Sequence, residues 1–269
     1  MATDRQGCPY RTPCSPRRMI FPGTEATAII LNTAGRVKRL LLVAADIYLC
    51  PDLFTLGMAH LLVFDFDGVL VDSLDVFMPA FLEACRREGA PLKDEADFFR
   101  LLEDNLYLGM MNRGMSRSTI LRIVLQVKEA IMSSWGRLQV FPGMAEVVRS
   151  LSAIHSLVVV TSNETETVET FLADRDLPWF DRVIGSDREP VKATILAGLR
   201  QEFPGLSCFY IGDTIGDIRE GRQAGVKTVG VTWGWHGPRV GQAQPDHLVH
   251  RPAELAALFA PQPWTEKKR

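Results

Sequence analysis

The chain has 269 residues, a hydrophobic fraction of 46% and a formal net charge of −2. This length suits one large α/β domain or a core with a small second domain, and the apolar fraction is enough to build a core. The near-neutral charge, without a basic tract, is not typical of a protein that binds nucleic acid.

Cysteine usage and hydropathy favour a cytoplasmic protein that does not enter a membrane. The 5 cysteines are odd in number and scattered, and none forms a Cys-x-x-Cys or zinc-ligand spacing. We therefore expect reduced thiols. No apolar run approaches the ~20 residues that a membrane span needs. The nearest candidate, Leu40–Cys50, is short and contains Asp46.

Residues 1–57 differ from the rest of the chain. Several prolines break any regular period there, and Thr24–Cys50 is weakly patterned with no obvious strand partners. A compact domain could begin at Met58. We interpret residues 1–57 as a poorly ordered or non-native extension, upstream of the true start codon. An organelle-targeting lead or a real small subdomain are the alternatives.

The next segment is an apolar run that ends in two aspartates. Leu61–Phe64 is followed by Asp65, Asp67 and Gly68. A short apolar run ended by a turn signal predicts a buried strand, and Gly68 permits the bend. Two clustered carboxylates repel each other, which is tolerable with a bound cation or a shared proton. The alternative is a strand end with solvated turn aspartates.

From residue 60 onward, strands and helices are predicted to alternate. The predicted helices are Asp75–Glu88, Lys93–Asp104, Ser116–Ser134, Met144–Ala153, Glu164–Arg175, Val191–Glu202 and Gly216–Ala224. The further strands are Leu157–Thr161, Arg182–Gly185, Cys208–Gly212 and Lys227–Thr232. Such alternation implies an α/β fold with a Rossmann-like parallel sheet covered on both faces by helices. The helical stretch 76–141 interrupts it, which predicts a core of 58–75 and 142–269 with an inserted helical cap of 76–141.

Two further strands end in polar side chains. Thr161, Ser162 and Asn163 follow the second strand, and Asp213 and Asp217 follow the fourth. Each group alone has an ordinary alternative as a helix N-cap. In an open parallel sheet, however, ligands bind beyond the carboxyl ends of the strands, so residues far apart in sequence can converge there. Carboxylate-rich oxygen sites suit a hard cation such as Mg²⁺.

These motifs together resemble the haloacid dehalogenase superfamily of phosphatases. The resemblance covers residues 60 to 258, and it is closest to the phosphoglycolate-phosphatase-like branch with a helical cap. It rests on Asp65-x-Asp67-Gly-Val-Leu-Val-Asp72, Thr161, Lys192 and Gly212-Asp213-x-x-x-Asp217. Relatives often carry Lys-Pro at the third motif, whereas here Pro190 precedes Lys192.

The resemblance implies an Mg²⁺-dependent phosphatase that hydrolyses a small phosphorylated metabolite such as 2-phosphoglycolate. It implies that Asp65 is the nucleophile that forms an aspartyl-phosphate, and that Asp67 is the general acid and base. Thr161 and Lys192 would stabilise the phosphoryl group. The expected metal ligands are Asp65, Asp67 through its backbone carbonyl, Asp213 and Asp217. Gly68, Ser162 and Asn163 are expected to contact the substrate.

The cap is expected to select the substrate. Arg113 and Arg117 lie in a Gly/Met-rich stretch and could grip a substrate carboxylate; the alternative is solvated arginines near a helix start. Trp233, Trp235 and His236 follow the last predicted strand and could line the pocket rim, with ordinary loop packing as the alternative.

Three other functions compete with phosphate monoester hydrolysis. A phosphosugar mutase of the same superfamily would use the same Asp65 and Asp67 pair. A dehalogenase would use one aspartate and no metal, which the second aspartate argues against. A non-catalytic phosphate-binding or interaction protein is expected to lose a nucleophile or a metal ligand, and none is missing here. Nothing in the sequence indicates the oligomeric state.

Overall fold

The computed structural model describes residues 29–33, 36–41 and 59–261. The chain divides into two units, Met1–Leu53 and Phe54–Arg269. In the first unit, β1 (Ile29–Thr33) pairs antiparallel with β2 (Arg36–Leu41). The expectation that this segment has no strand partners is therefore wrong for these residues. The interpretation of residues 1–57 as an extension otherwise falls largely outside the described residues and stays a prediction.

The second unit is built on a six-stranded sheet in the order β10-β9-β8-β3-β6-β7, and all its neighbouring strands are parallel. Its strands are β3 (His60–Phe64), β6 (Ser156–Val160), β7 (Arg182–Ile184), β8 (Ser207–Gly212), β9 (Lys227–Val231) and β10 (His247–Val249). The chain leaves β3 on one side to form β6 and β7, then crosses to the other side to form β8. The strand order therefore reverses at β3, where open α/β sheets bind ligands.

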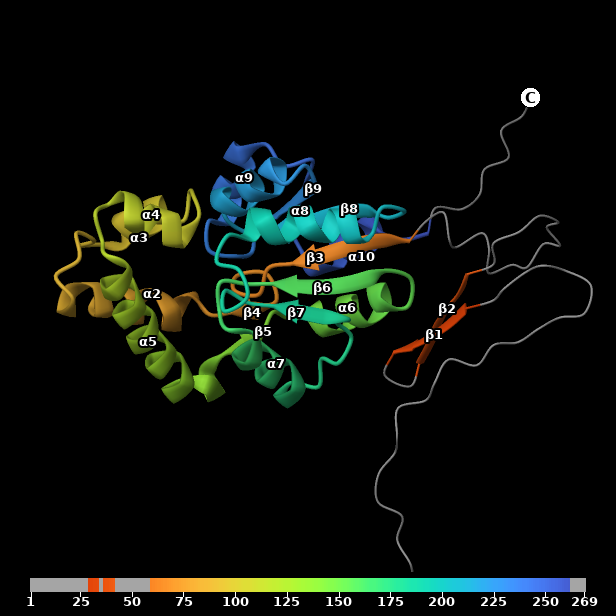
Figure 1. Cartoon of the computed structure of the whole chain (residues 1–269), viewed down its shortest axis with the longest axis horizontal. Coiled ribbons are helices and arrows are strands. Elements are labelled where there is room, and N and C mark those ends of the chain that lie inside the picture. Colours follow the sequence, from red (N-terminus) through yellow and green to blue (C-terminus); the bar gives the residue numbers. More distant parts are fainter. Residues whose placement is uncertain (1–28, 34–35, 42–58, 262–269) are drawn as a thin grey trace, which may run out of the picture. The chain divides into compact units, whose positions relative to one another are not determined.

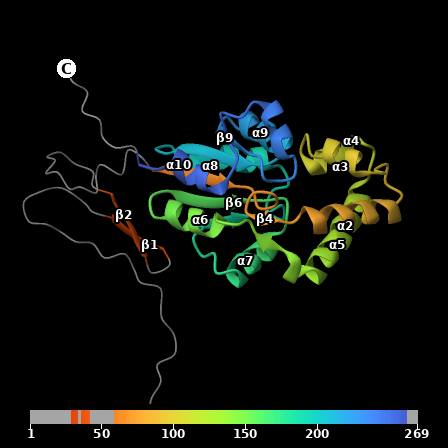
Figure 2. The same ribbon diagram turned by 180° about the vertical axis from the view of Figure 1, so that it is seen from behind.

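Helices cover both faces of this sheet (Figure 1). Because side chains alternate along a strand, Leu62 and Phe64 enter one core cluster and Leu61 and Val63 enter the other. Helices α6 (Met144–Ser152), α7 (Thr165–Asp174) and α10 (Pro252–Leu258) pack on the first face, and α8 (Lys192–Glu202) and α9 (Ile215–Gln223) on the second. The view from behind shows the same two layers (Figure 2). The predicted α/β fold with helices on both faces is confirmed.

An all-helical segment interrupts this alternation between two short strands. Strand β4 (Val71–Asp72) pairs antiparallel with β5 (Gln139–Val140). Between them lie α2 (Leu74–Arg87), α3 (Glu95–Leu101), α4 (Leu106–Asn112), α5 (Arg117–Ser133) and the 3₁₀ turn η1 (Trp135–Arg137). These helices bury a core of their own that includes Phe81, Phe98, Leu101 and Ile123. Helices were expected over this segment, but α4 was not among them.

The ends of the helical segment are set by local hydrogen bonds. The side chains of Asp94, Asn105 and Ser116 accept from backbone N–H groups at the starts of α3, α4 and α5. Such N-caps satisfy donors that have no partner within the helix. In the described part of the chain, no helix is both long and apolar enough to cross a bilayer.

Candidate active site

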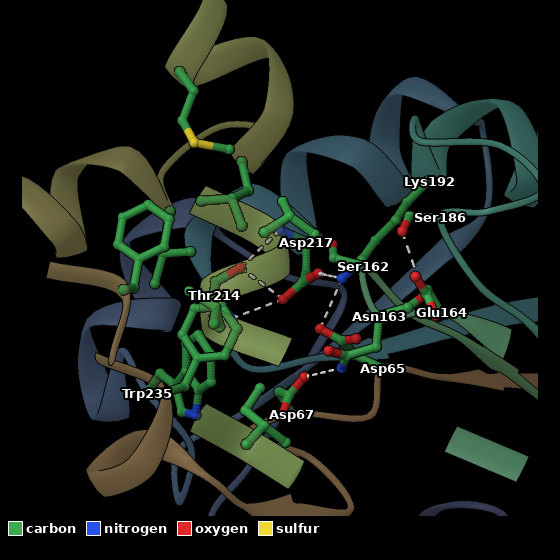
Figure 3. A pocket seen from close by; sticks show the side chains of 18 of the residues that line it. Asp65, Asp67, Ser162, Asn163, Glu164, Ser186, Lys192, Thr214, Asp217 and Trp235 are labelled. Atoms are coloured by element: carbon green, nitrogen blue, oxygen red, sulfur yellow. Dashed lines mark hydrogen bonds and ion pairs between the residues drawn. The ribbon is translucent and has the colours of Figure 1, made fainter. Parts of the chain in front are cut away.

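Residues from several strand ends meet where the carboxyl edge of the sheet faces helices α2 to α5. Asp65 and Asp67 follow β3, Ser162 and Asn163 follow β6, and Asp213 follows β8. Because β3 lies between β6 and β8 in the sheet, these side chains come together although up to 148 positions separate them. All five line one pocket, and Figure 3 shows Asp65, Asp67, Ser162 and Asn163 around it.

The centre of the site is a buried ion pair network. The Lys192 ammonium, at the start of α8, donates to Asp65 Oδ2 at 2.8 Å and to Asp217 Oδ1 at 2.9 Å. Asp65, Lys192 and Asp217 are all buried. Leaving a charged group unpaired in such surroundings would be costly, so the lysine compensates part of the carboxylate charge.

Asp217 is held in place by the first turn of α9. It forms a capping box with Thr214, whose backbone N–H and hydroxyl donate to Asp217 Oδ2 at 3.1 and 2.6 Å. The Tyr210 hydroxyl donates to Asp217 Oδ1 at 2.8 Å. With Lys192, these donors satisfy both oxygens, so Asp217 has little rotational freedom.

Asp213 differs from Asp217 because one of its oxygens is free. Its Oδ2 accepts from the Trp235 backbone N–H at 2.5 Å, whereas the buried Oδ1 has no hydrogen-bond partner among the residues that the structure describes. Two loops crowd this carboxylate, since a Cβ atom at Gly68 would lie 2.1 Å from Asp213 Oδ2 and one at Gly234 would lie 2.4 Å from it. Gly68 also has φ +73°, a conformation that favours glycine.

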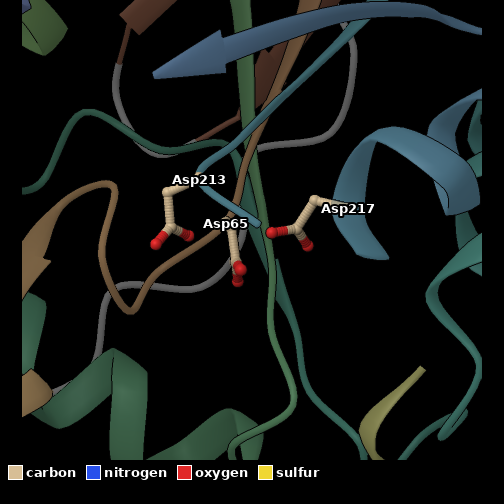
Figure 4. A group of neighbouring side chains, drawn as sticks. All are labelled: Asp65, Asp213 and Asp217. Carbon is tan, nitrogen blue, oxygen red and sulfur yellow. The ribbon is translucent and has the colours of Figure 1, made fainter. Parts of the chain in front are cut away.

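Asp65, Asp213 and Asp217 form a group that could hold a metal ion. One carboxylate oxygen from each lies within 4.8 Å of the others, and Figure 4 shows the three side chains facing a common point. Asp213, whose Oδ1 has no hydrogen-bond partner among the described residues, belongs to this group. A hard cation with oxygen ligands fits this donor set.

Burial and mutual repulsion shift the pKa values of these groups. Burial raises the pKa of Asp65 and of Asp213 well above the usual range, and the charge of Asp217 adds to the rise in both. Burial acts in the same direction on Asp217, but the Lys192 charge and several hydrogen bonds outweigh it and lower its pKa. The pKa of Lys192 is raised, because the attraction of Asp217 and Asp65 outweighs its burial. A bound cation would favour the ionised form of all three carboxylates.

Asp67 has surroundings of its own. The Ser73 hydroxyl donates to Asp67 Oδ1 at 2.6 Å, and the Asn163 amide donates to Oδ2 at 2.5 Å. Although part of its surface is exposed, enclosure by protein atoms raises the pKa of Asp67, and these two hydrogen bonds oppose the rise. A carboxyl with a raised pKa at the edge of a pocket is suited to hold and return a proton.

The residues predicted after β6 divide into two roles. Ser162 and Asn163 line the pocket. Thr161 is only 1% exposed, and its hydroxyl oxygen accepts from the Asn163 backbone N–H at 3.1 Å and from the Asn163 amide at 3.2 Å. Thr161 therefore positions Asn163, which in turn donates to Asp67.

The structure does not bring Arg113 and Arg117 to the pocket, and the expectation that they grip the substrate is corrected. Arg113 ends α4 and is exposed, and its guanidinium donates to the Gly109 carbonyl at 3.3 Å. Arg117 begins α5 and is also exposed. The physical reason is their position, since they flank the turn between α4 and α5 and both side chains are exposed to solvent.

The three aromatic residues after β9 also differ in role. Trp235 lines the pocket, as expected of a rim residue. Trp233 donates from its indole N–H to the Val69 carbonyl at 3.2 Å and packs on the core. His236 is buried; its Nδ1 accepts from the Ile215 N–H at 2.9 Å and its Nε2 lies 3.1 Å from the Phe99 carbonyl. Trp233 and His236 therefore act in packing.

The sequence analysis missed a contact between the helical segment and the core. The Asn105 amide donates to Glu220 Oε1 at 2.9 Å and to the Pro190 carbonyl at 3.3 Å. Asn105 and Glu220 are both buried, and burial raises the pKa of Glu220. The spacing of Glu220, three residues after Asp217, was an available signal, because residues three apart share one helix face.

Comparison with known proteins assigns the family. The family model of haloacid dehalogenase-like hydrolases matches residues 62–231. A phosphoglycolate phosphatase from Synechococcus elongatus is 29% identical over 199 residues, covering 72% of this chain and 94% of the relative. A probable phosphatase, IndB, from Dickeya dadantii is 28% identical over 193 residues, covering 66% of this chain and 84% of the relative.

Solved structures agree with this family. A haloacid dehalogenase-like family hydrolase from Streptococcus pneumoniae superposes with a TM-score of 0.60 at 26% identity, covering 75% of this chain and 99% of the other. A predicted phosphatase from Clostridium acetobutylicum has the same fold, with a TM-score of 0.63 at 19% identity, covering 75% of this chain and 98% of the other. The resemblance that the sequence motifs indicated is thus confirmed: the chain belongs to the haloacid dehalogenase-like hydrolases.

Proposed function

We propose that this protein is an Mg²⁺-dependent phosphatase that hydrolyses a small phosphate monoester through an aspartyl-phosphate on Asp65. The observation that carries the proposal is the arrangement at the ends of β3 and β8. There, Asp65 lies between a buried lysine and two further aspartates, at the base of a pocket. Relatives named phosphoglycolate phosphatase and phosphatase support the same reaction class.

The carboxylate group fits the proposed metal. Asp65, Asp213 and Asp217 supply oxygen ligands, and the unpartnered Asp213 Oδ1 is a buried acceptor in need of a positive partner. The backbone carbonyl of Asp67 is the further ligand that we propose. When bound, Mg²⁺ would supply positive charge that offsets the charges of the phosphate and the aspartates.

The proposed reaction has two displacements at phosphorus. In the first, an oxygen of Asp65 forms a bond to phosphorus while the ester P–O bond breaks, and Asp67 gives its proton to the leaving alcohol. In the second, Asp67 takes a proton from a water molecule, whose oxygen attacks the aspartyl-phosphate. The bond between Asp65 and phosphorus then breaks, and inorganic phosphate leaves.

Other residues around Asp65 would hold the phosphoryl group. We propose that Lys192 stabilises its negative charge as a point charge. We propose that Ser162 and Asn163, which line the pocket, supply hydrogen-bond donors to the phosphoryl group. The expected substrate contact of Gly68 is not part of this proposal, because its backbone N–H donates to the Val71 carbonyl at 2.9 Å. Thr161 would act indirectly, because its hydroxyl accepts hydrogen bonds from Asn163 and so positions that residue. The first substrate to test is 2-phosphoglycolate, the reference compound of the named relatives.

The test is phosphate release from a panel of phosphorylated metabolites. We expect release from the full chain with Mg²⁺, loss of activity with EDTA, and no release by Asp65→Asn. The control is Asp72→Asn, since Asp72 belongs to the same sequence motif but is exposed. Retained activity in Asp65→Asn would overturn the mechanism. An isomerised sugar phosphate in place of inorganic phosphate would support a mutase instead.

A further inference from the structure

The pocket above Asp65 has two walls of opposite character. The core wall carries the aspartates, Lys192, Ser162 and Asn163. The wall that α2, α4 and α5 contribute is apolar, and it includes Phe77, Phe81, Met110, Ile123, Val124 and Val127. The pocket holds about 1090 Å³ that protein atoms do not fill, part of it open to solvent. It thus has room for a leaving group beyond the phosphate.

The charged side chains at the helical wall are already paired. Lys128 lines the pocket but forms an ion pair with Glu164, which also lines it. Asp104 is exposed and lies 3.0 Å from Arg219. Among the described lining residues of the helical segment, none is a cation without a carboxylate partner. On the core wall, Lys192 is held by Asp65 and Asp217.

This charge distribution is unfavourable for a leaving group with a carboxylate. Such a group would give up hydration against apolar side chains without a cation to replace it, and an unpaired buried charge is costly. Arg113 and Arg117 of the helical segment do not supply that cation, because both are exposed and neither lines the pocket. The wall therefore selects against 2-phosphoglycolate relative to an uncharged ester of similar reactivity.

An aromatic surface begins directly beside the phosphoryl site. The backbone N–H of Trp235 donates to Asp213, so Trp235 is held next to a proposed metal ligand. The Trp235 ring packs on Phe77 with ring centroids 5.0 Å apart, and Phe77 stacks on Phe81 at 6.0 Å. Figure 3 shows Trp235 across the pocket from Lys192 and Ser186. A flat apolar group attached to a phosphate at Asp65 would meet these rings.

We propose that the leaving group of the substrate is apolar and uncharged, a primary alcohol that carries an aromatic ring or a short alkyl chain. This inference rests on the proposed phosphatase function and narrows its substrate class. Each methylene that the wall buries contributes about a fourfold gain in binding. We therefore expect an aromatic alkyl ester to be preferred over a two-carbon ester by about tenfold or more.

The test compares kcat/KM for 2-phenylethyl phosphate, n-hexyl phosphate, ethyl phosphate and 2-phosphoglycolate with the full chain and Mg²⁺. All four are esters of unactivated primary alcohols, so chemical reactivity differs little among them. We expect the first two to exceed ethyl phosphate by about tenfold or more, and 2-phosphoglycolate to fall below ethyl phosphate because of its carboxylate.

A matched pair of variants tests the wall itself. Val124 lines the pocket and is 42% exposed, whereas its neighbour Leu125 is 48% exposed and does not line it. Neither substitution buries a charge in the core. Val124→Arg should lower the ratio of kcat/KM for 2-phenylethyl phosphate to kcat/KM for 2-phosphoglycolate by about tenfold. Leu125→Arg should leave that ratio unchanged.

The outcomes separate the two proposals. Mg²⁺-dependent release with 2-phosphoglycolate equal to or better than 2-phenylethyl phosphate would overturn the apolar leaving group and leave the phosphatase function intact. An equal shift of the ratio in both arginine variants would also overturn it. Release from another phosphorylated metabolite but from none of the four esters would also overturn the apolar leaving group. No phosphate release from any compound tested would overturn the proposed function itself, and the inference with it.

Discussion

The ammonium of Lys192 lies 2.8 Å from Asp65 Oδ2, although 127 positions separate the two residues. The contact depends on the order of the strands, because Lys192 begins the helix after β7 whereas Asp65 directly follows β3. Both side chains are buried. Removing either charge of this pair should therefore affect both the stability of the fold and the proposed reaction.

Replacing Lys192 with methionine should impair both properties. Breaking a buried pair costs about 3 kcal/mol in the free energy of unfolding, because a carboxylate is left uncompensated. Loss of a positive donor at the phosphoryl group should lower kcat by about 100-fold or more. Urea unfolding and phosphate release measure the two effects, and Lys93→Met, at an exposed lysine, is the control. Near-normal kcat in Lys192→Met would contradict the proposed role.

Magnesium should stabilise the protein independently of catalysis. A ligand that binds only the folded state raises the free energy of unfolding, and the unpartnered Asp213 oxygen makes this carboxylate the most sensitive of the three. We expect Mg²⁺ to raise the urea midpoint of the wild type but not of Asp213→Asn. Without metal, the variant should be the more stable protein, because repulsion from Asp217 and Asp65 is relieved. Glu129→Gln, at an exposed position, should respond to Mg²⁺ as the wild type does.

The loop that carries Gly234 should not tolerate a side chain. A Cβ atom there would lie 2.3 Å from the Gly68 carbonyl and 2.4 Å from Asp213 Oδ2. Gly234→Ala must therefore displace Asp213, and we expect at least a tenfold loss of kcat and about 1–3 kcal/mol of stability. Gly136→Ala is the matched control, since nothing lies within 4 Å of a Cβ atom at that position. Equal activity of the two variants would show that the loop yields without moving the carboxylate.

The sequence predicted the strand ends well and the helical segment less well. Asp65 and Asp213 could be predicted as site residues because a buried parallel strand appears in the sequence as a short apolar run. The residue that follows such a run must lie at the edge of the sheet. Helix α4 could not be predicted because glycine is a poor helix former, and this helix of 7 residues contains Gly109 and is too short to give a clear periodic signal.

The positions of Arg113 and Arg117 relative to the pocket could not be predicted from the sequence. A pattern of charge and glycine indicated a substrate contact, but the direction of a side chain on a helix depends on where the helix begins. The spacing of Glu220 after Asp217 indicates that the two share a helix face, but the contact of Glu220 with Asn105 could not be predicted. It joins segments 115 positions apart, and only the packing of the helical segment on α9 brings them together.

Stability should fall as the pH drops below about 6.5, because of a buried histidine far from the proposed catalytic residues. His155 is 4% exposed; its Nδ1 accepts from the His60 backbone N–H at 3.1 Å and its Nε2 lies 2.9 Å from the Phe259 carbonyl. These partners require a neutral ring with its proton on Nε2. Burial lowers the pKa of His155, although the bond to Phe259 opposes the shift, and burial and the neighbouring His155 lower the pKa of His60.

The sign of this effect follows from the proton count. Between the folded and unfolded pKa values, the unfolded chain binds more protons, so the free energy of unfolding rises with pH and its full value is present above about 6.5. Urea unfolding at pH 7.5 and 5.5 should therefore show a loss at the lower pH that is smaller in His155→Gln. His250→Gln, at an exposed position where His250 Nδ1 lies 3.1 Å from the Thr232 hydroxyl, should keep the wild-type dependence. The same loss in His155→Gln as in the wild type would show that groups other than His155 cause the acid destabilisation.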